Sequence, residues 1–124
     1  MSDVTTARLE EVEPYSGPHA LEGIRFRPLA RALGVTAWGM NLIQIDPGAA
    51  TYPTHDHAGD GQEEVFVVLE GDAVLRADGE DRVVGAGSVV RIGPGVERTW
   101  RPGAAGVTLL ALGGTPGKPY EPRA

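Results

Sequence analysis

Short apolar runs separated by turn residues dominate the chain from residue 36 onward. The separators, such as "DPG", "ADGED", "GPG" and "RPGAAG", are rich in glycine, proline and aspartate, which favour turn conformations. No segment keeps a helical period over three turns, so the pattern predicts an all-β sandwich or barrel. The expected strands are 36–45, 64–71, 73–77, 82–84, 88–92, 97–101 and 107–112.

The two ends of the chain lack this pattern. The first part is polar and broken by glycine and proline, and only residues 24–33 suggest a short strand followed by one helical turn. The last residues are rich in proline and have no periodicity. We therefore expect one domain, with an N-terminal arm over 1–35, a barrel over 36–113 and an extended tail over 114–124.

Composition and charge narrow the class of protein. Hydrophobic residues make up 41% and charged residues 23% of the 124 residues, as in ordinary globular domains. A net charge of -6 without a basic stripe argues against nucleic acid as a partner. The longest strongly apolar run, "VFVVL", is too short to span a bilayer, and the acidic N-terminus does not resemble a signal peptide. We expect a cytoplasmic protein with no membrane partner.

The stretch "THDHAGDGQEE" carries the most chemistry. In an extended chain, His55 and His57 point to the same side because alternate strand residues share a face. Two carboxylates, Glu63 and Glu64, follow a short loop. The chain has no cysteine, so any metal would be held by nitrogen and oxygen. A solvent-exposed turn is the competing interpretation, because the aspartates and glycines of this stretch suit one.

The spacing of these residues resembles the first motif of the cupin superfamily. That motif has a glycine, a spacer, His-X-His, a glutamate, six residues and a closing glycine, which here would be Gly48, His55, His57, Glu64 and Gly71. The six-residue loop before the glutamate is longer than the family's usual three or four. Strand parity does not choose between the adjacent glutamates, but the spacing to the closing glycine favours Glu64 over its neighbour.

The resemblance implies a fold, a cofactor and a partner. The fold would be a cupin-type antiparallel β-barrel, or double-stranded β-helix, of the jelly-roll kind. His55, His57 and Glu64 would hold a divalent first-row metal (Fe, Mn, Ni or Zn), and three protein ligands would leave coordination positions open for catalysis. Cupins often form homodimers in which N-terminal strands cross, and the arm over 1–35 could do so here.

The second cupin motif is matched with one important departure. Gly87 and Gly95 are in register, but Arg98 occupies the position of the histidine and Pro102 that of the asparagine. Arginine stays protonated and cannot bind a metal. Three positions for Arg98 stay open: paired with Glu64 in place of a metal, beside the metal holding an anionic substrate, or turned to solvent.

Neighbours of these residues are candidates for a substrate pocket. Trp100 shares the strand face of Arg98, and Phe66 shares that of Glu64. Gln62 could add a polar group to the site, although a polar loop position is the simpler interpretation. A buried tryptophan is as often plain core as pocket lining. Tyr52 could reach the cavity mouth, but a surface position at a strand end is the stronger expectation.

The predicted function is a metal-dependent enzyme acting on a small, anionic molecule, by oxygenase (dioxygenase) or isomerase chemistry. In this hypothesis Arg98 is the catalytic residue that orients the substrate. A non-catalytic cupin that binds a small molecule is the first alternative. A degenerate, metal-free barrel with a Glu64–Arg98 ion pair is the second.

Overall fold

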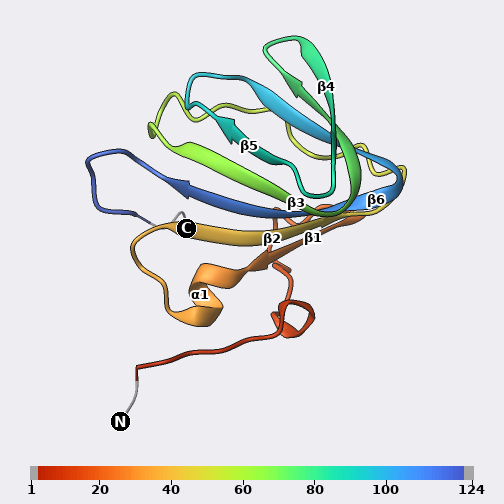
Figure 1. Ribbon diagram of the computed structural model, residues 1–124. Coiled ribbons are helices and arrows are strands. Elements are labelled where there is room, and N and C mark those ends of the chain that lie inside the picture. Colours follow the sequence, from red (N-terminus) through yellow and green to blue (C-terminus); the bar gives the residue numbers. More distant parts are fainter. Residues whose placement is uncertain (1–2, 122–124) are drawn as a thin grey trace.

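The computed structural model describes residues 3–121, and its regular secondary structure is mostly β-strand (Figure 1). The helical elements are one 3₁₀ turn, η1, and the short helix α1. In chain order the elements are η1 (Leu9–Glu11), β1 (Ile24–Pro28), α1 (Leu29–Leu33), β2 (Gly39–Ile45), β3 (Glu63–Ala77), β4 (Glu80–Gly85), β5 (Val89–Ile92) and β6 (Arg98–Gly114). The prediction of an all-β protein is confirmed.

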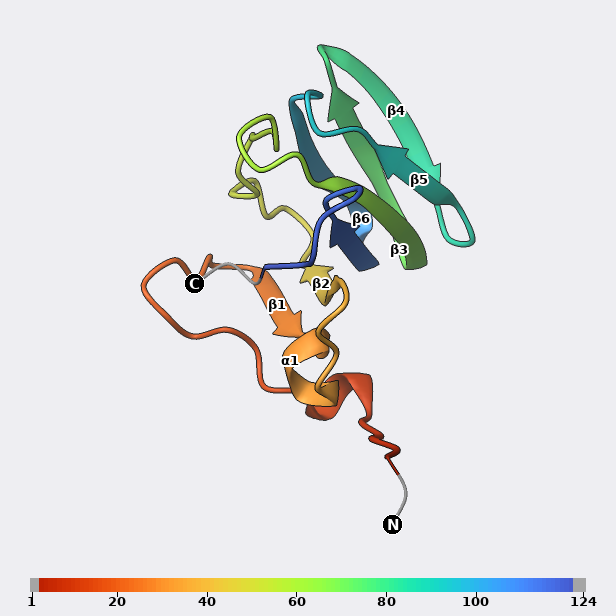
Figure 2. The ribbon, with the colours of Figure 1, turned by 90° about the vertical axis from the view of Figure 1, so that its left-hand side faces the viewer.

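The strands form one antiparallel sheet in the order β1-β2-β6-β3-β4, with β5 also paired to β3. Strand β3 is central because it pairs with β6 along nearly its whole length. On its other edge β5 pairs with residues 64–67 and β4 with residues 72–77. The sheet curls around its own interior, as Figures 1 and 2 show, and gives a jelly-roll-like barrel.

Apolar side chains pack on both faces of this sheet. The main cluster fills the concave interior and is built from alternate residues of the strands, among them Ile43, Phe66, Leu75, Trp100 and Leu109. A smaller cluster of Val12, Leu29 and Leu42 lies on the other face. There α1 and the N-terminal arm lie under β1 and β2, on the side away from β4 (Figure 1). The arm therefore covers only part of the outer face.

Two breaks that the sequence predicted between strands are absent from the structure. The segments 64–71 and 73–77 join in β3, and 97–101 and 107–112 join in β6, so the prediction of a separating turn at "RPGAAG" was wrong. Between Pro102 and Val107, residues 103–106 bulge opposite Asp72. The bulge requires glycine on both strands. Gly71 and Gly106 have φ angles of 74° and 79°, and a Cβ on Gly71 would overlap the carbonyl oxygen of Gly106.

The short strand and helical turn expected over 24–33 are present as β1 and α1. The helix ends at Gly34, whose φ of 79° allows a left-handed cap. Strand β1 pairs with β2 of the same chain, from Ile24 opposite Ile45 to Pro28 opposite Asn41. The domain boundaries at 35 and 113, and the crossing of the arm to a second subunit, stay predictions.

Candidate metal centre

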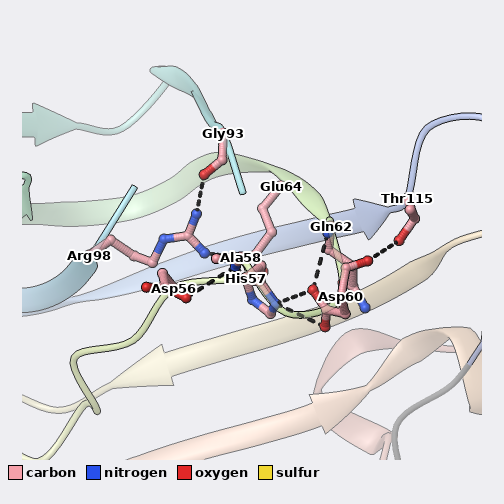
Figure 3. Close-up of polar contacts among 9 residues, drawn as sticks. All are labelled: Asp56, His57, Ala58, Asp60, Gln62, Glu64, Gly93, Arg98 and Thr115. Carbon is pink, nitrogen blue, oxygen red and sulfur yellow. Dashed lines mark hydrogen bonds and ion pairs between the residues drawn. The ribbon is translucent and has the colours of Figure 1, made fainter. Parts of the chain in front are cut away.

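The structure brings His55, His57 and Glu64 together, with one ligand atom from each within 4.8 Å of the others (Figure 3 shows His57 and Glu64). Glu64 projects from β3, while the histidines lie on the segment that precedes it. Backbone hydrogen bonds fix that segment. The amide of His55 donates to the carbonyl of Arg98 at 3.1 Å, and the amide of His57 donates to the carbonyl of Pro94 at 2.8 Å. The chain segments of both sequence motifs are thus held side by side.

Hydrogen bonds orient both imidazole rings. His55 Nδ1 lies 3.1 Å from the carbonyl oxygen of Pro53, and His57 Nδ1 lies 3.1 Å from Asp60 Oδ1. An acceptor at Nδ1 places the proton there and leaves the lone pair at Nε2, which is how proteins prepare histidine to bind a metal. His57 Nε2 faces Glu64 Oε1 at 3.3 Å. A proton or a cation between these two atoms would stabilise this arrangement.

Asp60 is a residue of the site that the sequence did not indicate. It lies in the loop after His57, and its Oδ1 also accepts the amide of Gln62 at 3.1 Å, while its backbone carbonyl accepts the hydroxyl of Thr115 at 3.0 Å (Figure 3). In the sequence, Asp60 looked like one more turn residue in a loop longer than the family's usual one. The structure shows that this loop holds the carboxylate against His57.

Replacing Asp60 by alanine should weaken metal binding by about 10–100-fold, as the loss of such orienting partners does at other metal sites. The matched control is Asp56→Ala, because the Asp56 carboxylate accepts the amide of Ala58 at 3.0 Å in the same loop. Competition with a fluorescent metal chelator would measure both variants. Equal affinities for the two would show that Asp60 does not orient a ligand.

Arg98 lies across the barrel from Glu64. Its Nη1 donates to Glu64 Oε1 at 2.8 Å and its Nη2 donates to the carbonyl of Gly93 at 2.7 Å (Figure 3). The Arg98 side chain is fully buried, which is incompatible with the solvent-facing position. Its Nε has no acceptor among residues 3–121. The Nε–H of the guanidinium is therefore a buried donor that the described protein groups do not satisfy.

The two adjacent glutamates face different surroundings. Glu63 Oε2 lies 2.7 Å from Arg91 Nη2 in an exposed ion pair, whereas Glu64 lies with the histidines. The side-chain oxygen of Gln62 lies near Gly113, so Gln62 borders the β3–β6 pair. The participation of Gln62 in substrate binding stays a prediction.

Phe66 and Trp100 pack against each other inside the barrel, with ring centroids 5.1 Å apart. Both are almost completely buried. They do not line the hollow of about 530 Å³ on the concave side, which is bordered by the end of β3, by β4 and β5, and by the turn after β5. Gly93 forms part of the wall of this hollow, and its carbonyl oxygen accepts a hydrogen bond from Arg98. The role of both aromatic residues in substrate binding stays a prediction.

Tyr52 is more enclosed than expected, because it packs against the interior cluster instead of standing free at a strand end. Its ring centroid lies 6.2 Å from that of His55. Loss of hydration, and then the negative charge of Glu64, raise the pKa of Tyr52 well above its usual value, while Arg98 lowers it. The hydroxyl thus stays protonated far into the alkaline range.

The raised pKa of Tyr52 predicts a loss of stability at high pH. Above about pH 10 an unfolded tyrosine releases its proton while the folded one keeps it, so the free energy of unfolding falls as pH rises, by up to about 1.4 kcal/mol per pH unit. Tyr52→Phe should flatten this slope above about pH 10. Urea denaturation at a series of pH values would measure this slope for both proteins. An equal slope in Tyr52→Phe and the unaltered chain would contradict the raised pKa of Tyr52.

The chain belongs to the cupin family. The cupin domain profile matches residues 41–111, and the structural neighbours are cupins, so both the resemblance of the motifs and the jelly-roll fold are confirmed. No curated protein sequence matches the chain. Among residues 3–121, no helix has the length and apolar character needed to cross a membrane.

Several solved structures share this fold. A cupin-superfamily sugar phosphate isomerase from Silicibacter pomeroyi is 23% identical, with a TM-score of 0.73 over 87% of this chain and 74% of that one. A predicted oxalate decarboxylase from Thermotoga maritima is 22% identical, with a TM-score of 0.71 over 88% and 97% of the two chains. A cupin from Bacteroides fragilis is 22% identical, with a TM-score of 0.68 over 89% and 91%. At these identities the likeness establishes the fold alone.

Proposed function

We propose that this cupin is a metal-dependent enzyme acting on a small, anionic substrate by isomerase or oxygenase chemistry. His55, His57 and Glu64 would hold a divalent Fe, Mn, Ni or Zn ion. The observation that carries the proposal is the pair of oriented histidine rings, each with its Nδ1 atom against an oxygen and within reach of Glu64. A plain polar turn has no need of this arrangement.

The donor set fits such an ion. Two imidazoles and one carboxylate suit first-row divalent metals, and fewer than four protein ligands leave room for substrate. Glu64 can serve both a metal and Arg98, because a carboxylate offers about four lone pairs and Arg98 Nη1 donates to only one of its oxygens, Oε1. When bound, the ion would act as a Lewis acid on a substrate oxygen.

Arg98 would bind the acidic group of the substrate. It is a permanent cation inside the barrel, and its Nε lacks an acceptor among the described residues. The Nε is closed off from solvent, so the substrate must displace a neighbouring side chain to reach it. Two structural neighbours are named as enzymes of anionic substrates, one as a sugar phosphate isomerase and one as a predicted oxalate decarboxylase. These names support an anionic substrate for this chain.

The test is a substrate screen on metal-loaded protein. Protein reconstituted separately with Fe(II), Mn(II), Ni(II) and Zn(II) would be assayed against sugar phosphates and small carboxylic acids, with and without dioxygen. We expect turnover that chelation and His57→Ala abolish, and a KM that Arg98→Lys raises more than it lowers kcat. Turnover that survives complete removal of metal would refute the proposal.

A metal-free binding protein is the second candidate, and one observation favours it. Arg98 and Glu64 already form a close ion pair inside the barrel, and the Gly93 carbonyl stabilises the guanidinium further. Such a protein would bind a small anion equally well with and without a chelator present. Calorimetric titration of the same acids into chelator-treated protein would separate the two candidates.

The partner and the location belong to the proposal as well. We expect a small-molecule ligand, no nucleic acid, a homodimer and a cytoplasmic protein. The acidic net charge of -6 supports the absence of nucleic acid binding.

A further inference from the structure

Two buried hydrogen-bond donors inside the barrel have no acceptor among residues 3–121, namely Nε of Arg98 and Nε1 of Trp100. Arg98 is 0% exposed and Trp100 is 1% exposed, so neither donor reaches bulk water. Most buried polar groups of folded proteins have a partner, because an unpaired donor loses its hydration without compensation. These two donors therefore indicate an acceptor that is not part of the described chain.

The two donors belong to the same face of one strand. Arg98 and Trp100 are two residues apart in the regular part of β6, before its bulge, so both side chains point into the barrel and their Cα atoms are about 7 Å apart. The protein already binds the other two nitrogens of the guanidinium, Nη1 through Glu64 and Nη2 through the carbonyl of Gly93 (Figure 3). The Nε is thus the nitrogen of Arg98 that remains for a ligand.

The hollow on the concave side adjoins the residues that carry these donors. Leu75 of β3 lines the hollow and is the cross-strand partner of Trp100. Ala77 lines it as well and is the partner of Arg98. The volume of about 530 Å³ is sufficient for a small metabolite. A shift of the side chains between the hollow and the donors would let the acidic end of such a molecule reach both of them.

The number of donors and the local charge favour a carboxylate over a phosphate group. A carboxylate has one negative charge and two oxygens, which matches two N–H donors that each bind over about 2.9 Å. A phosphate group carries up to about two charges and three strong acceptor oxygens. Arg98 is the one fully buried arginine among the described residues, and it shares its charge with Glu64. The ring of Phe66, which packs on Trp100, adds no further donor.

We propose that Trp100 Nε1 and Arg98 Nε together bind the carboxylate group of the substrate, so that Trp100 selects carboxylic acids over phosphate esters. This inference rests on the acidic ligand of the proposed function, and it adds the chemical class of that ligand and a second binding residue. The rest of the substrate occupies the hollow, whose inner wall is apolar at Leu75, Ala77 and Ile92.

Nuclear magnetic resonance of the indole N–H groups tests this assignment, because the chain has only two tryptophans, Trp38 and Trp100. Isotope-labelled protein, both chelator-treated and loaded with diamagnetic Zn(II), would be titrated with acetate, glycolate and lactate, and separately with inorganic phosphate and methyl phosphate. We expect the carboxylates to move the Trp100 signal to saturation in at least one of the two forms. The signal of Trp38, which is 46% exposed, should stay in place.

A matched pair of substitutions tests the donor itself. Trp100→Phe keeps an aromatic ring against Phe66 but removes the N–H, and it should raise the dissociation constant of the best-binding acid at least about tenfold. Trp38→Phe makes the same chemical change at an exposed position and should leave this constant unchanged. Circular dichroism would show that both variants are folded, and equal constants for the two folded variants would overturn the inference.

The inference and the proposed function fail in different ways. If no carboxylate moves the Trp100 signal in either form, the inference is wrong even where metal-dependent turnover is found. It is also wrong if the phosphates move this signal at concentrations as low as the carboxylates do. A saturable movement with carboxylates alone, without turnover under any metal, would uphold the carboxylate site and refute the enzyme activity.

Discussion

Arg98→Leu should lower the free energy of unfolding of the metal-free protein by about 3–5 kcal/mol, because it removes the cation that compensates a carboxylate inside the barrel. Arg98 is fully buried and the Glu64 side chain is 16% exposed, so we expect a value near the lower end. The carbonyl of Gly93 also loses its donor. Urea denaturation with and without a chelator measures the effect.

The control is Arg91→Leu, which removes the exposed ion pair with Glu63 and should cost less than about 1 kcal/mol. The double variant Glu64→Leu, Arg98→Leu should recover much of the loss, since an apolar pair can replace a buried ion pair. If Arg98→Leu costs no more than Arg91→Leu, the ion pair inside the barrel contributes no special stability. The role of Arg98 as the partner that compensates Glu64 would then be wrong.

Arg98→His should tighten metal binding by at least about tenfold, or about 1.4 kcal/mol. The change removes a positive charge beside the ligand set and places an imidazole at the position where the second cupin motif has its histidine. The backbone there is already suited to this, because Arg98 and His55 exchange two backbone hydrogen bonds, at 3.1 and 2.9 Å. Metal titration of the unaltered chain and the variant would compare the dissociation constants.

Arg98→Lys is the matched variant, since it keeps a charge at the same place and should not tighten metal binding. A histidine variant that binds metal no better than the lysine variant would mean that the side chain at this position does not reach the ligand set. The geometry of the site argues otherwise, because Arg98 Nη1 contacts a carboxylate that lies with both histidines.

Much of the fold could be predicted because strand positions follow from short-range pattern. The apolar run after Glu64 indicated a strand that became part of β3, although both of its faces are apolar, and the weak signal over 24–33 marked β1 and α1. The bulge at residues 103–106 could not be predicted. "PGAAG" is as typical of a turn as of a bulge, and only pairing with the distant Gly71 distinguishes them.

The residues of the candidate site also fall into those that the sequence indicated and those that it did not. His55, His57 and Glu64 could be singled out because their spacing resembles the first cupin motif, which lies within one short stretch of the sequence. Asp60 was not, because its role depends on the path of a loop that curls back to His57. The three open positions of Arg98 likewise depended on contacts across the barrel, with Glu64 and the Gly93 carbonyl, that no local pattern encodes.

The most direct test of the metal centre is the metal content of protein purified without an affinity tag, measured by mass spectrometry beside a His55→Ala, His57→Ala double variant. We predict close to one equivalent of a first-row divalent metal per chain, or uptake of one equivalent on reconstitution, and none in the double variant. No uptake by the unaltered chain of Fe(II), Mn(II), Ni(II) or Zn(II) would contradict the proposed metal centre. Glu64 would then serve only as the partner of Arg98.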